Sequence, residues 1–189
     1  MTFRKEAVQS ILAALRLAKF DADGMDDLNL TADGFWRSFG AAVLLAPFSA
    51  IMAAMLWTET EASTVASAFG GSVKYVLSWI VFPIVMIFVA RFLGLSGRYV
   101  QFIISYNWSS VVQVGLFFAL TMLGIAGVVA GELALLLHFI ALIYVVMYMT
   151  FIARVALGVA WATAAGVVIL DVIVELLLLT ATSHLLPGG

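Results

Sequence analysis

Two carboxylates in the last hydrophobic segment have the clearest potential for chemistry in this sequence. Asp171 and Glu175 lie four positions apart within residues 159–183, which are otherwise apolar and long enough to cross a bilayer. A carboxylate near the centre of a membrane helix costs about 2.5–3.5 kcal/mol, so the acids are expected to be neutral, paired or turned toward other helices. Positions four apart share a helix face, which also carries Ala160, Ala164 and Thr182. We therefore predict that this face contacts protein.

The composition places these acids in an integral membrane protein. Of the 189 residues, 65% are hydrophobic and only 11% are charged, which is unlike a soluble domain. The formal charge of -2 gives no reason to expect nucleic acid as a partner, and there is no cysteine for a disulfide or a thiolate site. The sequence contains no zinc-protease, serine-hydrolase or nucleotide-binding motif. We therefore predict a protein that is not an enzyme and that has no cofactor or metal.

Five apolar segments must position the acids. Each supplies about the 20 residues that cross a hydrocarbon core of roughly 30 Å. The predicted spans are residues 35–57, 72–93, 99–127, 133–151 and 159–183. The predicted fold is an all-α polytopic membrane protein: residues 34–189 form a five-helix transmembrane domain, and residues 1–33 form a cytoplasmic amphipathic helix and an acidic linker.

Residues 3–19 have the pattern of a surface helix that is too short and too charged to span a membrane. Apolar side chains recur at three- and four-residue spacing, at Ala7, Val8, Ile11, Leu12, Leu15 and Ala18, and Lys5, Gln9 and Arg16 lie opposite. Two placements are open: the helix lies in the cytoplasmic headgroup layer, or it packs on the cytoplasmic face of the protein. The acidic linker lacks the spacing of a calcium-binding EF-hand and is expected to be a solvated loop.

The distribution of cations predicts the orientation of the spans. Cations precede the first span, flank the turn after the second and lie near the end of the fourth, at Arg4, Lys5, Arg16, Lys19, Arg37, Arg91, Arg98 and Arg154. The other connections carry only Lys74, beside Glu59, Glu61 and Glu132. Because cytoplasmic loops are enriched in Lys and Arg, we predict a cytoplasmic N-terminus and a C-terminus outside.

The third span carries a stripe of polar side chains. They recur every three or four residues and therefore share one helix face: Arg98, Gln101, Ser105, Ser109 and Gln113. A lipid-facing stripe of this kind would be expensive, so it is expected to face the bundle or a wet cavity. Asn107 points to the opposite side and needs a different neighbour.

Depth along the spans predicts partners for the buried acids. At about 1.5 Å of helical rise per residue, Glu175 and His138 have similar depths, so we predict that they pair. Asp171 is near the midplane, level with residues 110–113 and with Tyr144. Those groups are its predicted partners.

Three interpretations of the buried polar groups stay open. As structural groups they hydrogen-bond across helices and fix the packing. As a path for protons or cations they combine acids with a histidine that changes charge near neutral pH. As a contact site they bind a partner subunit or a lipid headgroup. The structural interpretation is favoured because five spans do not divide into the equal repeats that are usual in transporters.

Two segments carry a resemblance to known membrane proteins. DGFWRSFGAAVLLAP at 33–47 and RYVQFIISYNWSSVVQ at 98–113 resemble an uncharacterised group of alphaproteobacterial inner-membrane proteins. More distantly, the architecture is similar to that of the Yip1 domain family, in which a cytoplasmic N-terminal region precedes five spans. The resemblance implies a multi-pass protein of the bacterial inner (plasma) membrane, and it transfers no site residue.

These observations predict a non-enzymatic, Yip1-like protein that organises partner proteins or lipid within the membrane. A small proton- or cation-coupled transporter or channel that uses Asp171, Glu175 and His138 is the first alternative, and an accessory subunit of a larger membrane complex is the second. The expected partners are membrane lipid and either further copies of the chain, as a homo-oligomer, or another membrane protein.

Overall fold

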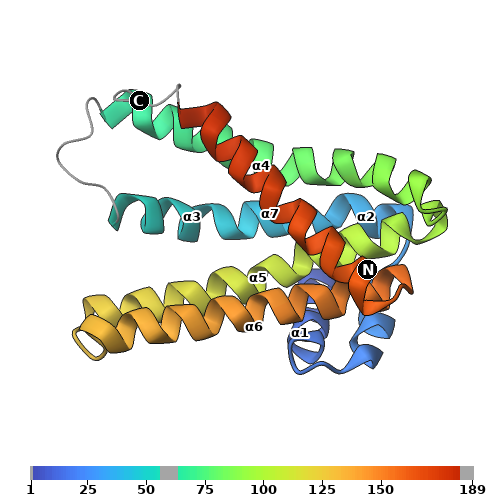
Figure 1. The fold of residues 1–189 in the computed structure, drawn as a ribbon, viewed down its shortest axis with the longest axis horizontal. Coiled ribbons are helices and arrows are strands. Elements are labelled where there is room, and N and C mark those ends of the chain that lie inside the picture. The colour runs from blue at the N-terminus through green and yellow to red at the C-terminus, as the bar shows by residue number, and fades with distance from the viewer. Residues whose placement is uncertain (1, 56–63, 184–189) are drawn as a thin grey trace.

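The computed structural model describes residues 2–55 and 64–183, and every element within these ranges is helical (Figure 1). The predicted end of the first span at residue 57 and the residues from 184 onward lie outside these ranges. The helices are α1 (Phe3–Ala18), α2 (Ala32–Ser38), α3 (Gly40–Met55), α4 (Thr64–Phe92), α5 (Tyr99–Ile125), α6 (Gly131–Leu157) and α7 (Trp161–Ser183), with short 3-10 helices η1 (Ala22–Asp27) and η2 (Ser96–Arg98).

Five helical stretches are long and apolar enough to cross a membrane, and they confirm the predicted all-helical class. They are Ala32–Met55, Gly70–Phe92, Ser96–Ile125, Gly131–Leu157 and Trp161–Thr182. The fourth of these stretches, α6, continues beyond the predicted span end at residue 151. It ends at Leu157, and the next residue, Gly158, has a left-handed backbone (φ 67°) that caps the helix.

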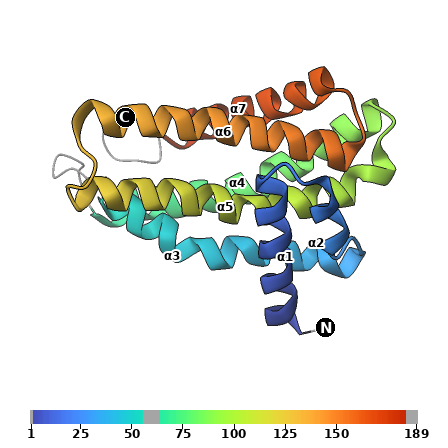
Figure 2. The same ribbon diagram turned by 90° about the horizontal axis from the view of Figure 1, so that it is seen from below.

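Helices α3, α4, α5 and α6 lie roughly along one axis, α7 runs obliquely to it (Figure 1), and α1 crosses it. Helices α5 and α6 form an antiparallel hairpin, α7 packs on α6 and α4, and α2 and α3 pack on α5. Figure 2 shows α1 running across this axis and against α5. The turn between α5 and α6 requires glycine, because Gly127 and Gly131 have φ of 70° and 58°.

The core is concentrated where α1 crosses the long helices. Its largest fully buried side chains include Trp108, Tyr148, Phe82 and Phe102, and the α1 residues Ala13, Ala14 and Leu17 belong to the same cluster. Alanine on α1 removes side-chain bulk, so this helix lies close to its neighbours. The N-terminal helix is therefore part of the packed bundle.

The outward faces of the long helices are apolar. On α6 the exposed side chains include Leu135, Leu136, Phe139, Ile140, Leu142 and Ile143, and on α7 they include Ile169, Val172, Ile173, Leu176 and Leu177. Soluble proteins rarely expose contiguous apolar surface on this scale. These faces need an apolar surrounding.

The start of α2 depends on a hydroxyl cap. Thr31 Oγ1 accepts a hydrogen bond from the Gly34 backbone N–H at 3.1 Å. We expect Thr31→Ala to lower the free energy of unfolding by about 1 kcal/mol, because an unpaired N–H remains at the helix start. Thermal unfolding in detergent measures the change. Thr150→Ala is the control, since the Thr150 hydroxyl bonds only within its own helix, to Val146 O; an equal loss in both variants would contradict the capping role.

Candidate functional site

Both acids of α7 bind hydroxyl groups of neighbouring helices. Tyr106 Oη, on α5, donates to Asp171 Oδ1 at 2.8 Å. Ser78 Oγ, on α4, donates to Glu175 Oε2 at 3.3 Å. The acids therefore join α7 to two different helices, one helical turn apart.

The predicted protein-facing stripe of α7 is only partly correct. Ala164 and Thr182 are buried, and Asp171 and Glu175 are half-buried. Ala160 is exposed, because it precedes the first residue of α7 and does not share the helix face.

The predicted partners of the acids are wrong. Glu175 meets Ser78, while His138 Nδ1 lies 2.8 Å from the Ala134 carbonyl of its own helix. The His138 ring stacks on Phe117 with centroids 6.4 Å apart. Equal depth does not place two side chains at the same angle around the bundle. Here Glu175 faces α4, and His138 does not face Glu175.

Asp171 also misses its predicted partners on α5 and α6. Tyr144 donates to Ala18 O at the end of α1. Gln113 Nε2 donates to Met149 Sδ at 3.0 Å, and Ser110 Oγ donates to Tyr106 O at 3.3 Å. Tyr106 was not recognised from the sequence because tyrosine also fits an apolar helix face.

The surroundings of Asp171 are otherwise apolar. Its cage is completed by Phe82, Phe102, Met149, Val167 and Val168, and the space between them has no room for a water molecule. A carboxyl group in such a cage depends on its one hydroxyl neighbour for orientation. The arrangement suits a fixed interhelical bond better than a hydrated path.

The polar stripe of α5 is covered by the N-terminal helices and by α6. Ser105, Asn107 and Ser109 are buried, and Gln101 and Gln113 are half-buried. Ser105 Oγ donates to its own helix, at 2.9 Å from Gln101 O. From Gln101 to Gln113 the stripe therefore faces protein, as predicted.

Asn107 lies on the side of α5 opposite the polar stripe, and it connects α5 to α2. Its Nδ2 donates to Ser38 Oγ at 2.9 Å, and Ser38 Oγ donates to Phe35 O at 2.7 Å. Asn107 Oδ1 is the buried side-chain oxygen without a hydrogen-bond partner in the described part of the chain. The neighbour that the sequence left open is thus the N-terminal helix α2.

Two tyrosines of α6 hold the C-terminal half of α1. Tyr148 Oη donates to Ala14 O at 2.8 Å and lies 3.0 Å from Ser109 Oγ. Tyr144 Oη donates to Ala18 O. Both bonds go to backbone carbonyls of α1, so sequence periodicity gives no signal for them.

The N-terminal half of α1 is held by a buried acid. Glu6 is only 3% exposed, and its carboxylate accepts hydrogen bonds from Asn29 Nδ2 at 2.9 Å and from Arg37 Nη1 at 3.0 Å. Arg37 Nε also lies 2.8 Å from Asp33 Oδ2. These contacts fix α1, the segment after it and α2 as one unit, which we call the N-terminal module (residues 3–38).

The buried face of α1 differs from the predicted one. The structure buries Glu6, Ser10, Ala13, Ala14, Leu17 and Ala18. It exposes Val8, Leu12 and Leu15, which we call the α1 ridge. Of the predicted apolar face only Ala18 is fully buried, because the surface that α1 covers is itself partly polar and close-packed. The helix packs on the protein and also leaves the ridge uncovered.

The acidic linker is folded against α1, which corrects its description as a solvated loop. Met25 and Leu28 are buried, and Arg16 forms ion pairs with Asp21 Oδ2 at 2.7 Å and Asp27 Oδ2 at 2.6 Å. The hydrogen bond from Arg16 lowers the pKa of the Asp21 carboxyl below its ordinary 3.8, against an opposing effect of desolvation.

This pKa shift predicts an acid-sensitive contact. Because the folded-state pKa of Asp21 is lowered, the ion pair contributes stability above the ordinary pKa, and this contribution is lost as the pH falls through the lowered value. We expect Arg16→Gln to reduce the difference in melting temperature between about pH 6 and about pH 3. Arg4→Gln, at an exposed position of α1, is the control. An unchanged pH difference in Arg16→Gln would refute the assignment.

Neither a metal site nor a similar known protein points to a function for this chain. Among the described residues, no group of three or more His, Cys, Asp or Glu side chains is placed to hold a metal ion. The sequence matches no protein-family model, and no curated protein and no solved structure matches the chain. Function must therefore be inferred from the geometry.

Proposed function

We propose that this chain is a non-enzymatic protein of a bacterial inner membrane, with five spans, that organises lipid or partner proteins through its N-terminal module. Support for the membrane comes from the apolar outward faces of α6 and α7 and from the lengths of the five apolar helices. The resemblance to the Yip1 domain family stays a prediction.

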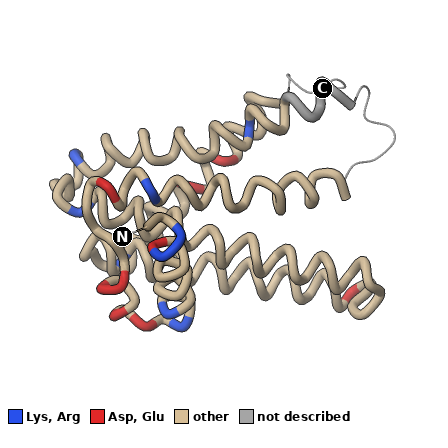
Figure 3. The backbone as a smooth tube through the Cα atoms, turned by 180° about the vertical axis from the view of Figure 1, so that it is seen from behind, with Lys and Arg blue, Asp and Glu red and all other residues tan. Residues whose placement is uncertain are grey.

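The orientation rests on charge. Figure 3 shows Lys and Arg gathered mainly at the end of the bundle that carries the N-terminal module. Exposed Trp36 and Trp161 belong to α2 and to the start of α7, as expected for an aromatic belt at an interface. The proposal places this end in the cytoplasm.

The observation that carries the functional proposal is the two-sided α1. Its inner face is fixed by Glu6, Tyr144 and Tyr148, while the α1 ridge is exposed, with Leu12 57% exposed. The helix runs across the spans (Figure 2), which is the direction of a helix in the plane of a membrane surface. A rigid helix with an uncovered apolar ridge suits a contact surface for lipid or a partner.

Co-purification from native membranes tests this proposal. We expect wild-type protein to retain a stoichiometric partner or bound lipid that Leu12→Lys loses. Leu30→Lys, at another exposed apolar side chain of the N-terminal module, should retain it. Equal retention by all three proteins would count against the ridge. Recovery of one large complex would instead support the accessory-subunit alternative.

A proton- or cation-coupled transporter is the second candidate, and the observation in its favour is the pair of acids on α7 that meet Tyr106 and Ser78. Measurement of proton or cation flux into liposomes that contain the purified protein distinguishes the transporter from the organising protein. The organising role predicts no proton or cation leak. A flux that Asp171→Asn abolishes would support transport.

A further inference from the structure

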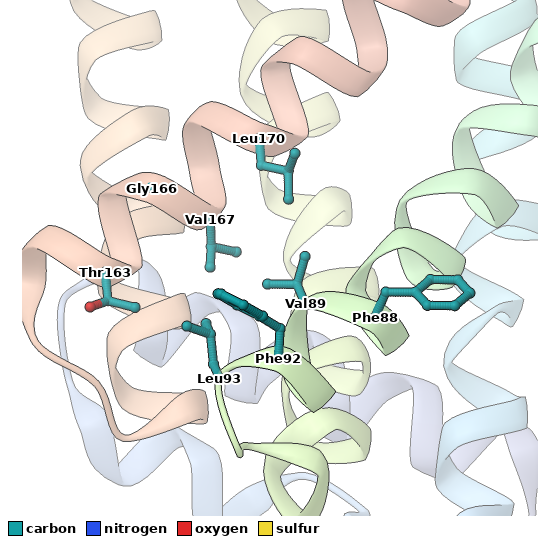
Figure 4. A pocket seen from close by; sticks show the side chains of 8 residues that line it. All are labelled: Phe88, Val89, Phe92, Leu93, Thr163, Gly166, Val167 and Leu170. Carbon is teal, nitrogen blue, oxygen red and sulfur yellow. The ribbon is translucent and has the colours of Figure 1, made fainter.

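A groove between α4 and α7 forms an apolar hollow outside the contacts described above. Its volume is about 490 Å³, within the usual size of small-molecule sites. It is lined on α4 by Phe88 and Phe92, just after α4 by Leu93, and on α7 by Thr163, Gly166 and Leu170 (Figure 4). The groove is open to the outside, and Phe92 at its edge is 89% exposed.

Gly166 makes room for a ligand along α7. A Cβ atom at this position would meet no atom within 4 Å, so the groove reaches the helix backbone. The lining is apolar apart from the hydroxyl of Thr163, which Figure 4 shows at the end of the groove nearest the turn into α7. An extended hydrocarbon chain matches this shape and chemistry.

Three arginines belong to the helix ends that flank the α4–α5 and α6–α7 turns, and Thr163 follows the second of these turns in the first turn of α7. Arg91 is adjacent to Phe92 on α4 and is exposed. The Arg154 guanidinium lies 4.9 Å from the ring centroid of Trp161, two positions before Thr163. The Arg98 guanidinium lies against Gly158, where a Cβ atom would be 3.3 Å from Arg98 Cζ.

No carboxylate among the described residues neutralises these arginines, although Arg154 contacts the Trp161 ring. Within the described residues, neither Arg91, Arg98 nor Arg154 forms an ion pair with a carboxylate, whereas Arg16 and Arg37 do. A planar guanidinium is suited to bind phosphate through paired N–H groups. The turns at this end of the bundle therefore carry exposed cations that can attract an anionic partner.

We infer that the α4–α7 groove binds an anionic phospholipid, with an acyl chain along Gly166 and the phosphate beside Arg91 and Arg154. The inference rests on the membrane embedding proposed above but uses a surface different from the α1 ridge. Each arginine near an anionic headgroup contributes about fivefold to lipid affinity. The site therefore discriminates phosphatidylglycerol from phosphatidylcholine with the same acyl chains.

Lipid titration of the purified full chain in detergent tests the site by native mass spectrometry and thermal unfolding. We expect phosphatidylglycerol to bind and stabilise the protein, and phosphatidylcholine to do so at least tenfold more weakly. Arg91→Gln and Arg154→Gln should each reduce the affinity for phosphatidylglycerol about fivefold. Gly166→Leu should remove binding by filling the groove. Lys5→Gln, which neutralises an exposed cation on α1, should leave binding unchanged.

Three results would overturn the site. The first is equal affinity for the two lipids, and the second is full affinity in both arginine variants. The third is equal stabilisation by glycerol phosphate, which has the anion but no acyl chain. The arginine variants decide the matter even if Gly166→Leu does not fold. Carbonate extraction of native membranes separately tests the embedding, so its failure is distinguishable from failure of the groove.

Discussion

Glu6→Ala is expected to loosen α1 from the rest of the N-terminal module. The carboxylate is buried and accepts hydrogen bonds from Asn29 and Arg37, so its removal leaves both donors without this acceptor. The bond to Asn29 alone belongs to a class worth about 1.5–3 kcal/mol. We expect the free energy of unfolding in detergent to fall by about 2–3 kcal/mol. We also expect faster proteolysis within residues 19–31.

Asp33→Ala is the matched control for Glu6→Ala. Asp33 also pairs with Arg37, but its side chain is 65% exposed. An exposed ion pair contributes little, so proteolysis and stability should stay close to wild type. Equal effects of the two substitutions would show that charge on Arg37, and not the buried Glu6 contact, holds the module.

Tyr106→Phe is expected to lower stability by about 2 kcal/mol, because it removes the hydroxyl that binds Asp171 in an apolar cage. Tyr99→Phe should cost less, because Tyr99 Oη donates to a backbone carbonyl, that of Pro83. A double-mutant cycle with Asp171→Leu isolates the pair: the loss from Tyr106→Phe should largely disappear when the acid is absent. Tryptophan fluorescence during denaturant unfolding provides the measurement. A cycle with no coupling would show that the bond contributes nothing to packing.

The sequence was sufficient for the helices and for the direction in which most of the polar groups point. Long apolar runs define the spans, and four-residue spacing predicts that Ser105 and Ser109 face protein. Helical period and hydropathy are local properties, so one sequence is enough to read them.

The hydrogen-bond partners of the buried polar side chains could not be predicted in the same way. Depth was the only coordinate available for Glu175 and His138, and the rotation of α4 brought Ser78 to Glu175 instead. The buried face of α1 was missed for a related reason. Burying Glu6 is favourable only because Arg37 on α2 and Asn29 just before it, far along the chain, bind its carboxylate.

The docking of α1 has a consequence for biosynthesis. The bond from Tyr148 to Ala14 joins residues 134 positions apart, so α1 leaves the ribosome long before its anchoring surface exists. At about 5–20 residues per second, the delay is roughly 7–27 s. If the chain is embedded as proposed, the α1 ridge gives the helix a way to rest on the bilayer during that interval. Docking of α1 against α5 and α6 is then a late step of assembly, and it requires that the α5–α6 hairpin is complete.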